Sequence, residues 1–269
     1  MSSRLLASLL VAFLLLHPTL PACAQPPDTV FLEDLTWTEV RDQIRSGKTT
    51  VIVPIGGTEQ NGPHMALGKH NARVKALSAR IARALGNALV APVIAYVPEG
   101  STTPPSGHMR FAGTITVSDA TFTQILESAA RSFKAHGFRD IVFLGDHGGY
   151  QALEKVAADK LDREWAATPV RAHAIIEYYR VTETDYAQAL KARGYSEQEI
   201  GTHAGLGDTS LALAVDPSLV RSDAMQAPPE TNAGVHGDPR RSSAALGQIG
   251  VDLIVAKTVA AINAATARH

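Results

Sequence analysis

The chain contains four runs of apolar, largely β-branched residues, separated by segments with helical periodicity. The runs are TTVIVPIG at 49–56, ALVAPVIAYV at 88–97, DIVFLGDHGGY at 140–150 and VRAHAIIEY at 170–178. Near-continuous apolar runs are typical of strands that are covered on both faces. Their alternation with helices predicts an α/β fold with a mostly parallel sheet and helices on both of its faces.

Two of the intervening segments have clear helix patterns. Residues 71–86 place Val74, Leu77 and Ile81 on one stripe, and Gly86 follows as a stop signal. Residues 118–137 begin with the capping candidates Ser118 and Asp119 and close with Gly137. Further helices are expected near 150–165, 182–193 and 207–215, and from about Ser242 onward.

Composition supports a folded domain and argues against some functions. The 269 residues are 45% hydrophobic and 19% charged, which is enough apolar material for one packed domain, expected at 25–269. The net charge of −1 offers no electrostatic basis for binding nucleic acid.

The N-terminal residues have the pattern of a secretory signal peptide, expected at 1–24. Arg4 precedes an apolar run from Leu5 to Leu16, and ACA at 22–24 supplies small residues for cleavage. The run is too short for a comfortable membrane span. We therefore expect an exported protein, periplasmic or secreted. A lipid anchor on Cys23, the only cysteine, is the alternative, and in either case the mature domain has no disulfide.

Polar loops follow two of the predicted strands, at 56–70 and 145–150. The carboxyl ends of parallel strands meet at one edge of a sheet, so these loops should lie together. They carry Glu59, His70 and His147, and two imidazoles with one carboxylate are a common ligand set for catalytic zinc. Each also has a structural explanation: a turn cap for Glu59, a helix N-cap for His70, and a core histidine for His147.

Five sequence blocks resemble the creatininase (creatinine amidohydrolase) family, in the same order. The first is PIGGTEQNGPHMALGKH at 54–70, similar to the opening signature of that family. The others are GHMRFAGT at 107–114, GFRDIVFLGDHGGY at 137–150, HAGLGDTSLALAVDPSLV at 203–220 and GVHGDPRRSSAALG at 234–247. The resemblance extends over roughly residues 30–265.

The resemblance implies a three-layer αβα fold, a zinc or manganese site that often holds two ions, and hydrolysis of amide C–N bonds in small molecules. It also implies a homo-oligomer, commonly a hexamer. Glu59 and His147 match family ligands, whereas Asn61 stands where the family has a histidine and His70 where it has a metal-bridging aspartate. An imidazole has one lone pair to give and cannot bridge two ions. One Zn²⁺ or Mn²⁺, held by Glu59, His70 and His147, is therefore favoured; two ions with rearranged ligands, or none, are the alternatives.

Other positions receive roles from the same resemblance. His203 matches the proton-transfer histidine, which suits an imidazole that titrates near neutrality. Asp208 would orient that imidazole or bind metal, or would instead be a helix N-cap. His64 and His108 are expected to line the pocket or support the ligands, as Tyr178 and Tyr179 also could, and Asp238 is expected to be a turn residue.

These observations favour an exported, metal-dependent hydrolase of a small amide, in which His203 moves the proton. Creatinine is not the expected substrate, because Glu199 and its neighbours occupy the region where creatininase has a tryptophan. The alternative is a metal-free exported binding protein, or pseudoenzyme, on a degenerate scaffold. A lyase or isomerase acting on a carbohydrate derivative is a third, weaker hypothesis.

Overall fold

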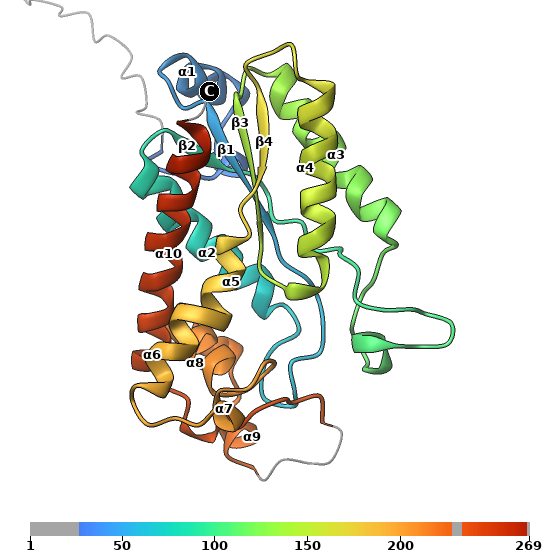
Figure 1. The fold of residues 1–269 in the computed structure, drawn as a ribbon, viewed down its shortest axis with the longest axis vertical. Helices are drawn as coiled ribbons and strands as arrows, with labels where there is room; N and C mark the ends of the chain where they lie inside the picture. Colours follow the sequence, from blue (N-terminus) through green and yellow to red (C-terminus); the bar gives the residue numbers. More distant parts are fainter. Residues whose placement is uncertain (1–26, 228–232, 268–269) are drawn as a thin grey trace, which may run out of the picture.

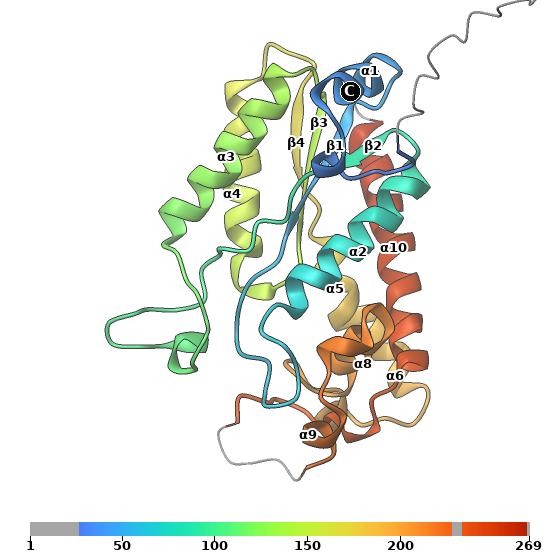
Figure 2. The same ribbon diagram turned by 180° about the vertical axis from the view of Figure 1, so that it is seen from behind.

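The structure is a computed structural model that describes residues 27–227 and 233–267. In this part of the chain, four strands form one sheet in the order β2-β1-β3-β4, and all three pairings are parallel. Helices cover both faces of the sheet (Figures 1 and 2), which confirms the expected three-layer αβα fold. The expected signal peptide at 1–24, with Cys23, lies outside the described residues.

The strands are β1 (Thr50–Ile55), β2 (Ala88–Val90), β3 (Asp140–Gly145) and β4 (Arg171–Ala174). The α-helices are α1 (Trp37–Arg45), α2 (Lys69–Leu85), α3 (Asp119–Ala135), α4 (Gln151–Glu164), α5 (Glu177–Val181), α6 (Ala187–Lys191), α7 (Glu197–Ile200), α8 (Leu206–Val215), α9 (Ser222–Gln226) and α10 (Ala244–Thr266). Short 3-10 turns are η1 (Leu32–Asp34), η2 (Gly107–Arg110), η3 (Gly148–Tyr150), η5 (Pro217–Leu219) and η6 (Pro239–Arg241), and η4 (Thr182–Tyr186) is π-helical.

The side chains of β1 alternate between two apolar cores. Val51 and Val53 pack into the core shared with α3 and α4, whereas Ile52 packs into the core shared with α2, α5 and α10. All six residues of β1 are buried, as its near-continuous apolar run predicts. Full burial of such a side chain contributes about 1.5–3 kcal/mol. The sheet is therefore a rigid base for the loops that leave its carboxyl edge.

The second strand is shorter than the sequence pattern predicts. β2 ends at Val90, although the apolar run continues to Val97. Pro92 has no N–H to donate to a ladder, so regular pairing stops there. The chain makes one further isolated bridge, between Ile94 and Ile55. The long loop that follows leads back over the carboxyl edge of the sheet.

The helices α2 and α3 lie close to their predicted positions. Ser118 caps α3 by accepting a hydrogen bond from the Thr121 N–H, and Gly86 ends α2 in the left-handed conformation. However, α2 begins at Lys69, two residues before the predicted start. Lys69 and His70 are consequently fixed in the first helical turn instead of in a loop.

The C-terminal helix α10 is, by length and composition, apolar enough to cross a membrane. It packs against α8, α5 and α2, and 33% of its apolar window is buried inside the structure. At the lower end of Figure 1, α5, α6, α7, α8 and α9 gather beyond the carboxyl edge of the sheet. The polar residues after β1, β2 and β3 meet these helices, and the candidate site lies there.

Candidate active site

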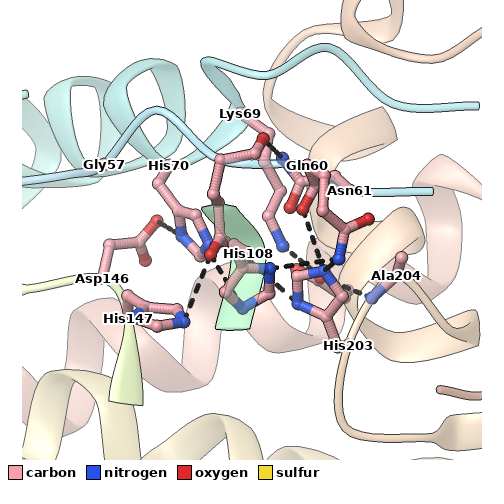
Figure 3. A network of polar contacts seen from close by, with 12 residues as sticks. Gly57, Gln60, Asn61, Lys69, His70, His108, Asp146, His147, His203 and Ala204 are labelled. Carbon is pink, nitrogen blue, oxygen red and sulfur yellow. Dashed lines mark hydrogen bonds and ion pairs between the residues drawn. The ribbon is translucent and has the colours of Figure 1, made fainter. Parts of the chain in front are cut away.

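Three loops and one helix end bring the polar residues of the site together. Glu59 follows β1, Glu99 and His108 follow β2, and His147 follows β3. These loops meet at the carboxyl edge, as the parallel topology requires. The first turn of α2 adds a further wall, and the segment between α7 and α8 adds His203. Figure 3 shows the histidines converging from these separate elements.

The carboxylate of Glu59 is the centre of the site. Its side chain is fully buried, and its Oε1 lies 2.8 Å from His70 Nε2. Its Oε2 lies 3.4 Å from His147 Nε2 and 3.2 Å from His108 Nε2. The three residues predicted as ligands, Glu59, His70 and His147, are therefore in contact through one carboxylate. Burial acts to raise the pKa of Glu59, but His70, His147 and Lys69 together bring it below its usual range.

Two residues of this cluster were not predicted as ligands from the sequence. Ligand atoms of Glu59, Glu99, His108 and His147 all lie within 4.8 Å of one another, which is compact enough to hold a metal ion. His108 was expected only to line the pocket, and Glu99 was not singled out. The available signal was the same one that marked Glu59: a charged residue in the loop after a buried strand.

Three carboxyl oxygens of this cluster lack a hydrogen-bond partner among the described residues. Glu59 Oε2 and both Glu99 carboxyl oxygens are buried and accept no hydrogen bond from the described residues. Burial, and then the neighbouring negative charge of Glu59, raise the pKa of Glu99 to about 10. Two buried carboxyl groups with unpaired oxygens are costly unless a proton or a cation lies between them.

His70 is held on both sides of its ring. Its Nε2 donates to ionised Glu59, and its Nδ1 lies 3.1 Å from Asp146 Oδ2 and 3.2 Å from Arg73 Nη2. Arg73 also donates to both oxygens of Asp146, at 3.0 and 2.8 Å. His70 therefore orients Glu59 through Oε1, while Oε2 remains directed toward His108 and His147.

Asp208 belongs to the same charged network. It accepts from Lys69 Nζ, from Arg73 Nη1 at 2.7 Å and from the Ala204 N–H at 2.9 Å. It lies inside the first turn of α8, whose N-cap is Gly205, so the N-cap interpretation of Asp208 is wrong. The cap position passes to Gly205 because the helix starts earlier than the sequence pattern predicts. Burial acts to raise the pKa of Asp208, but Lys69 and then Arg73 hold it well below its usual range.

His203 is positioned for proton transfer. Its Nε2 lies 3.0 Å from the backbone carbonyl oxygen of Gln60 and 3.0 Å from the side-chain amide nitrogen of the same residue; in the tautomer with the proton on Nε2, the ring donates to the carbonyl. The lone pair is then on Nδ1, 3.8 Å from Glu59 Oε1. Burial, and then the charge of Lys69, lower the pKa of His203 to about 4. A neutral imidazole is therefore present at neutral pH and is able to accept a proton.

The remaining predicted residues support the site or lie beside it. The amide of Asn61 donates to the carbonyls of Glu59 and Ala66, so it braces the loop. His64 pairs with Thr209 at 2.9 Å. Tyr179 lines the cavity, while Tyr178 is buried in the core. Asp238 caps the turn η6, as expected of a turn residue.

A hydroxyl that the sequence did not mark fastens the ends of two strands. Tyr150 Oη accepts from the Asp146 N–H at 3.2 Å, and it lies 3.0 Å from the carbonyl oxygen of Ile55 and 2.5 Å from that of Gly56. It therefore ties the end of β1 to the end of β3, from which Glu59 and His147 depart.

The charges of the site fit a divalent cation. Two cationic side chains, Lys69 and Arg73, face four carboxyl groups, those of Glu59, Glu99, Asp146 and Asp208. With the histidines set aside, the balance is −1 while Glu99 is protonated and −2 when all four carboxyl groups are ionised. Buried charge of one sign requires compensation. Imidazole and carboxylate donors are the ligands that zinc prefers, and manganese also accepts carboxylate oxygens.

A cavity of about 360 Å³ opens directly onto this cluster. His70, His147, His203 and Asp208 are among the residues that line it. A second cavity of about 770 Å³ adjoins it and shares His108 and His236. Fold and site together define an α/β protein with a buried carboxylate–histidine centre at the mouth of a cleft, which is the architecture of an enzyme active site.

The family follows from comparison with known proteins. The family model for creatininase, described as creatinine amidohydrolase, matches residues 33–262. The chain belongs to the creatininase family of amidohydrolases, which confirms the resemblance found in the sequence blocks.

Several relatives are named for different substrates. The creatinine amidohydrolase of Pseudomonas putida is 28% identical over 207 residues, which are 76% of this chain and 78% of the relative. A mycofactocin precursor peptide peptidase of Mycobacterium tuberculosis is 30% identical, over 77% of this chain and 81% of the relative. A 3-dehydro-scyllo-inosose hydrolase of Thermotoga maritima is 23% identical, over 73% of this chain and 60% of the relative.

Solved creatininase structures have the same fold, and some are named for their metals. A mutant creatininase of "Zn-Zn type" aligns with a TM-score of 0.73 and 25% identity, over 88% of this chain and 98% of that chain. A structure named "Creatininase Mn" aligns with a TM-score of 0.71 and 25% identity, over 87% and 98% of the two chains.

Proposed function

We propose that the protein is a metal-dependent amidohydrolase that cleaves a C–N bond in a small molecule, using one divalent ion, Zn²⁺ or Mn²⁺. The observation that carries this proposal is the pair of buried carboxyl groups, Glu59 and Glu99, with unpaired oxygens facing His108 and His147. These four residues would hold the ion. His70 would fix Glu59 from its other oxygen.

When bound, such an ion polarises a carbonyl and lowers the pKa of a water in its shell. The chain's own residues do the rest. His203 Nδ1 would take a proton from the attacking water and deliver it to the leaving nitrogen. Gln60 holds the His203 ring through Nε2, so that Nδ1 points toward the Glu59 carboxylate. The buried charge network of Arg73, Asp146 and Asp208 would keep these groups in place.

The metal shell is tested by counting metal in purified protein and matched variants. We expect one ion per chain, lost in His147→Ala and in His108→Gln but retained in His70→Gln. The exposed His136, at the end of α3, supplies the control variant His136→Gln. Loss of metal in His70→Gln with retention in His108→Gln would favour instead the shell predicted from sequence, Glu59, His70 and His147.

Chelation separates the enzyme from the metal-free alternative. A ligand present at 100 times its Kd stabilises the folded state by about 2.7 kcal/mol, so removal of metal should lower the thermal midpoint. A protein that contains no stoichiometric metal and is indifferent to chelator would support the exported binding protein.

The cleft favours a substrate larger than a single small ring. The inner cavity of about 360 Å³ shares the lining residues His108 and His236 with the second cavity of about 770 Å³. Creatinine would leave most of this volume empty. A panel of cyclic amides, short peptides and sugar-derived amides, assayed with metal-loaded protein, would show which class is hydrolysed. Turnover of creatinine in preference to all of these would contradict the size argument.

The name of the Thermotoga maritima relative, 3-dehydro-scyllo-inosose hydrolase, supports a second candidate, hydrolysis of a ring ketone of the inosose type. Including such a ketone in the panel tests it. Export and assembly into a homo-oligomer stay predictions, and the processed N-terminus and the solution mass of the secreted protein would check them.

A further inference from the structure

Lys69 is a buried lysine on the wall of the active-site cavity. It is the first residue of α2, and only 1% of it is exposed. It nevertheless lines the inner cavity together with His147, His203 and Asp208. Lysine is almost never fully buried unless its charge has a use or a partner. In Figure 3 its side chain runs from the start of α2 toward His108 and His203.

Lys69 is not the only partner of Asp208. Asp208 Oδ1 accepts from Arg73 Nη1 at 2.7 Å, and Oδ2 accepts from the Ala204 N–H at 2.9 Å. The carboxylate therefore has a guanidinium partner and a backbone donor without Lys69. Conversely, an ammonium has three N–H donors, and within 27–227 and 233–267 only Asp208 accepts from it. Two donors remain for a group inside the cavity.

The charge of Lys69 lies close to the reacting groups. Lys69 lines the inner cavity together with His108, His147 and His203, and its Nζ is paired with Asp208, which lines the same cavity. A fixed cation with free donors, beside a proton-transfer histidine and a carboxylate–histidine cluster, is suited to bind an oxygen that becomes negative during reaction.

We propose that Lys69 is a catalytic residue whose ammonium binds the carbonyl oxygen of the scissile amide and stabilises the negative charge that develops there. The inference rests on the proposed hydrolase function. As the water oxygen bonds to the carbonyl carbon, the π electrons of C=O move to the oxygen held by Lys69. His203 takes the proton released by the water. Collapse re-forms C=O, breaks the C–N bond, and passes that proton from His203 to the leaving nitrogen, while Lys69 keeps its own protons.

The kinetic test compares Lys69→Gln, Lys69→Arg and the control Lys75→Met, all in helix α2, using the substrate found by the panel. Lys75 is on the exposed side of the helix. Removing a donor to a developing oxyanion lowers kcat by about 10²–10³-fold, so we expect that loss in Lys69→Gln, with KM changed less than threefold. Lys69→Arg, which keeps the charge, should recover part of kcat, and Lys75→Met should match the wild type.

Two readouts do not depend on turnover. All of these variants should retain one metal ion per chain. Binding of inorganic phosphate, a tetrahedral oxyanion, should weaken at least tenfold in Lys69→Gln and remain unchanged in Lys75→Met, as measured by calorimetry. A kcat for Lys69→Gln within threefold of wild type, or equal phosphate affinity in the two variants, would overturn the assignment.

If Lys69→Gln fails to fold, the proposal is tested in a protein that also carries Asp208→Asn. Lys69→Met combined with Asp208→Asn removes both charges, and its phosphate affinity is compared with that of Asp208→Asn alone. Weaker binding in the double variant supports the proposal, and equal binding refutes it. If the wild type instead binds no metal and hydrolyses nothing in the panel, the hydrolase function itself fails. Metal and activity in the wild type with no effect of Lys69→Gln would defeat the Lys69 inference alone.

Discussion

Two buried regions of this protein hold a glutamate in opposite ways. At the carboxyl edge of the sheet, Glu59 is surrounded by His70, His147 and Lys69, and its pKa is lowered. Between β3 and α4, Glu154 is as completely buried, but neither of its carboxyl oxygens has a partner among the described residues. Burial raises the pKa of Glu154 well above its usual value. Both glutamates are buried, so burial does not distinguish them. The basic side chains around Glu59 are what set it apart from Glu154.

The Glu154 carboxyl group occupies space that is free because residue 145 is a glycine. A Cβ on Gly145, the last residue of β3, would collide with the Glu154 carboxyl oxygen. The Glu154 side chain therefore fills a gap beneath the strand, and its raised pKa favours the uncharged acid. The active-site edge, in contrast, concentrates charge and compensates it with Lys69 and Arg73. Substitutions in the two regions should accordingly differ in size and in sign.

The largest effect is expected at Arg73. Arg73→Met leaves Asp146 and Asp208 buried without their guanidinium partner. Breaking a buried ion pair in this way costs about 3–5 kcal/mol, measured as the free energy of unfolding in urea. Arg80→Met, on the exposed side of the same helix, should change it by no more than about 0.5 kcal/mol. Equal effects of the two substitutions would mean that the network does not stabilise the edge.

An intermediate effect is expected at Tyr150, which joins the two regions. Tyr150→Phe removes the hydroxyl that accepts from the Asp146 N–H and contacts the carbonyls of Ile55 and Gly56. The Asp146 N–H keeps its hydrogen bond to the Ile55 carbonyl at 3.0 Å, so the Gly56 carbonyl is the group left unpaired, which should cost about 1–3 kcal/mol of unfolding free energy. Tyr96→Phe is the control, because Tyr96 is 56% exposed. No difference between the two variants would show that the strand ends are held by other contacts.

A smaller effect of opposite sign is expected at Glu154. An acid whose pKa is raised by folding gives its full stability below the unfolded pKa of 4.5 and loses it as pH rises above that value. Glu154→Gln should therefore be more stable than the wild type at pH 7, with a gain that disappears near pH 4. Glu59→Gln, in chelated protein, should be less stable than wild type at pH 7, because the pKa of Glu59 is lowered. Denaturation midpoints across pH measure both, and effects of the same sign at pH 7 would contradict the contrast.

The smallest effect is expected for an ion pair outside both buried regions. Lys160 on α4 contacts the Glu127 carboxylate on α3 at 2.8 Å, with the Lys160 side chain 54% exposed and the Glu127 side chain 8% exposed. Because Glu127 also pairs with Arg131 at 3.2 Å, the carboxylate keeps a cationic partner in Lys160→Ala, and the loss should be roughly 0–1 kcal/mol of unfolding free energy. A loss comparable to that of Arg73→Met would show that burial does not set the strength of these pairs.

The sequence was sufficient for the strands and the helices with strong periodicity. The apolar run 49–56 became β1, an inner strand of the sheet that is buried on both faces, and Gly86 ended α2 as its conformational freedom allows. It was insufficient at Pro92, where the lost N–H ended β2 early. It also misjudged the start of α8, where Gly205 and not Asp208 occupies the cap.

The sequence by itself determined that Glu59 and His147 would meet, because residues that follow neighbouring parallel strands share one edge of the sheet. Only the tertiary structure decided what joins them. Glu99 and His108 reach the cluster through a long loop whose path no local pattern specifies, and Lys69 enters it because α2 begins two residues early. Periodicity is a property of neighbouring residues, whereas the charge balance of a buried site depends on which distant side chains the packing brings into contact.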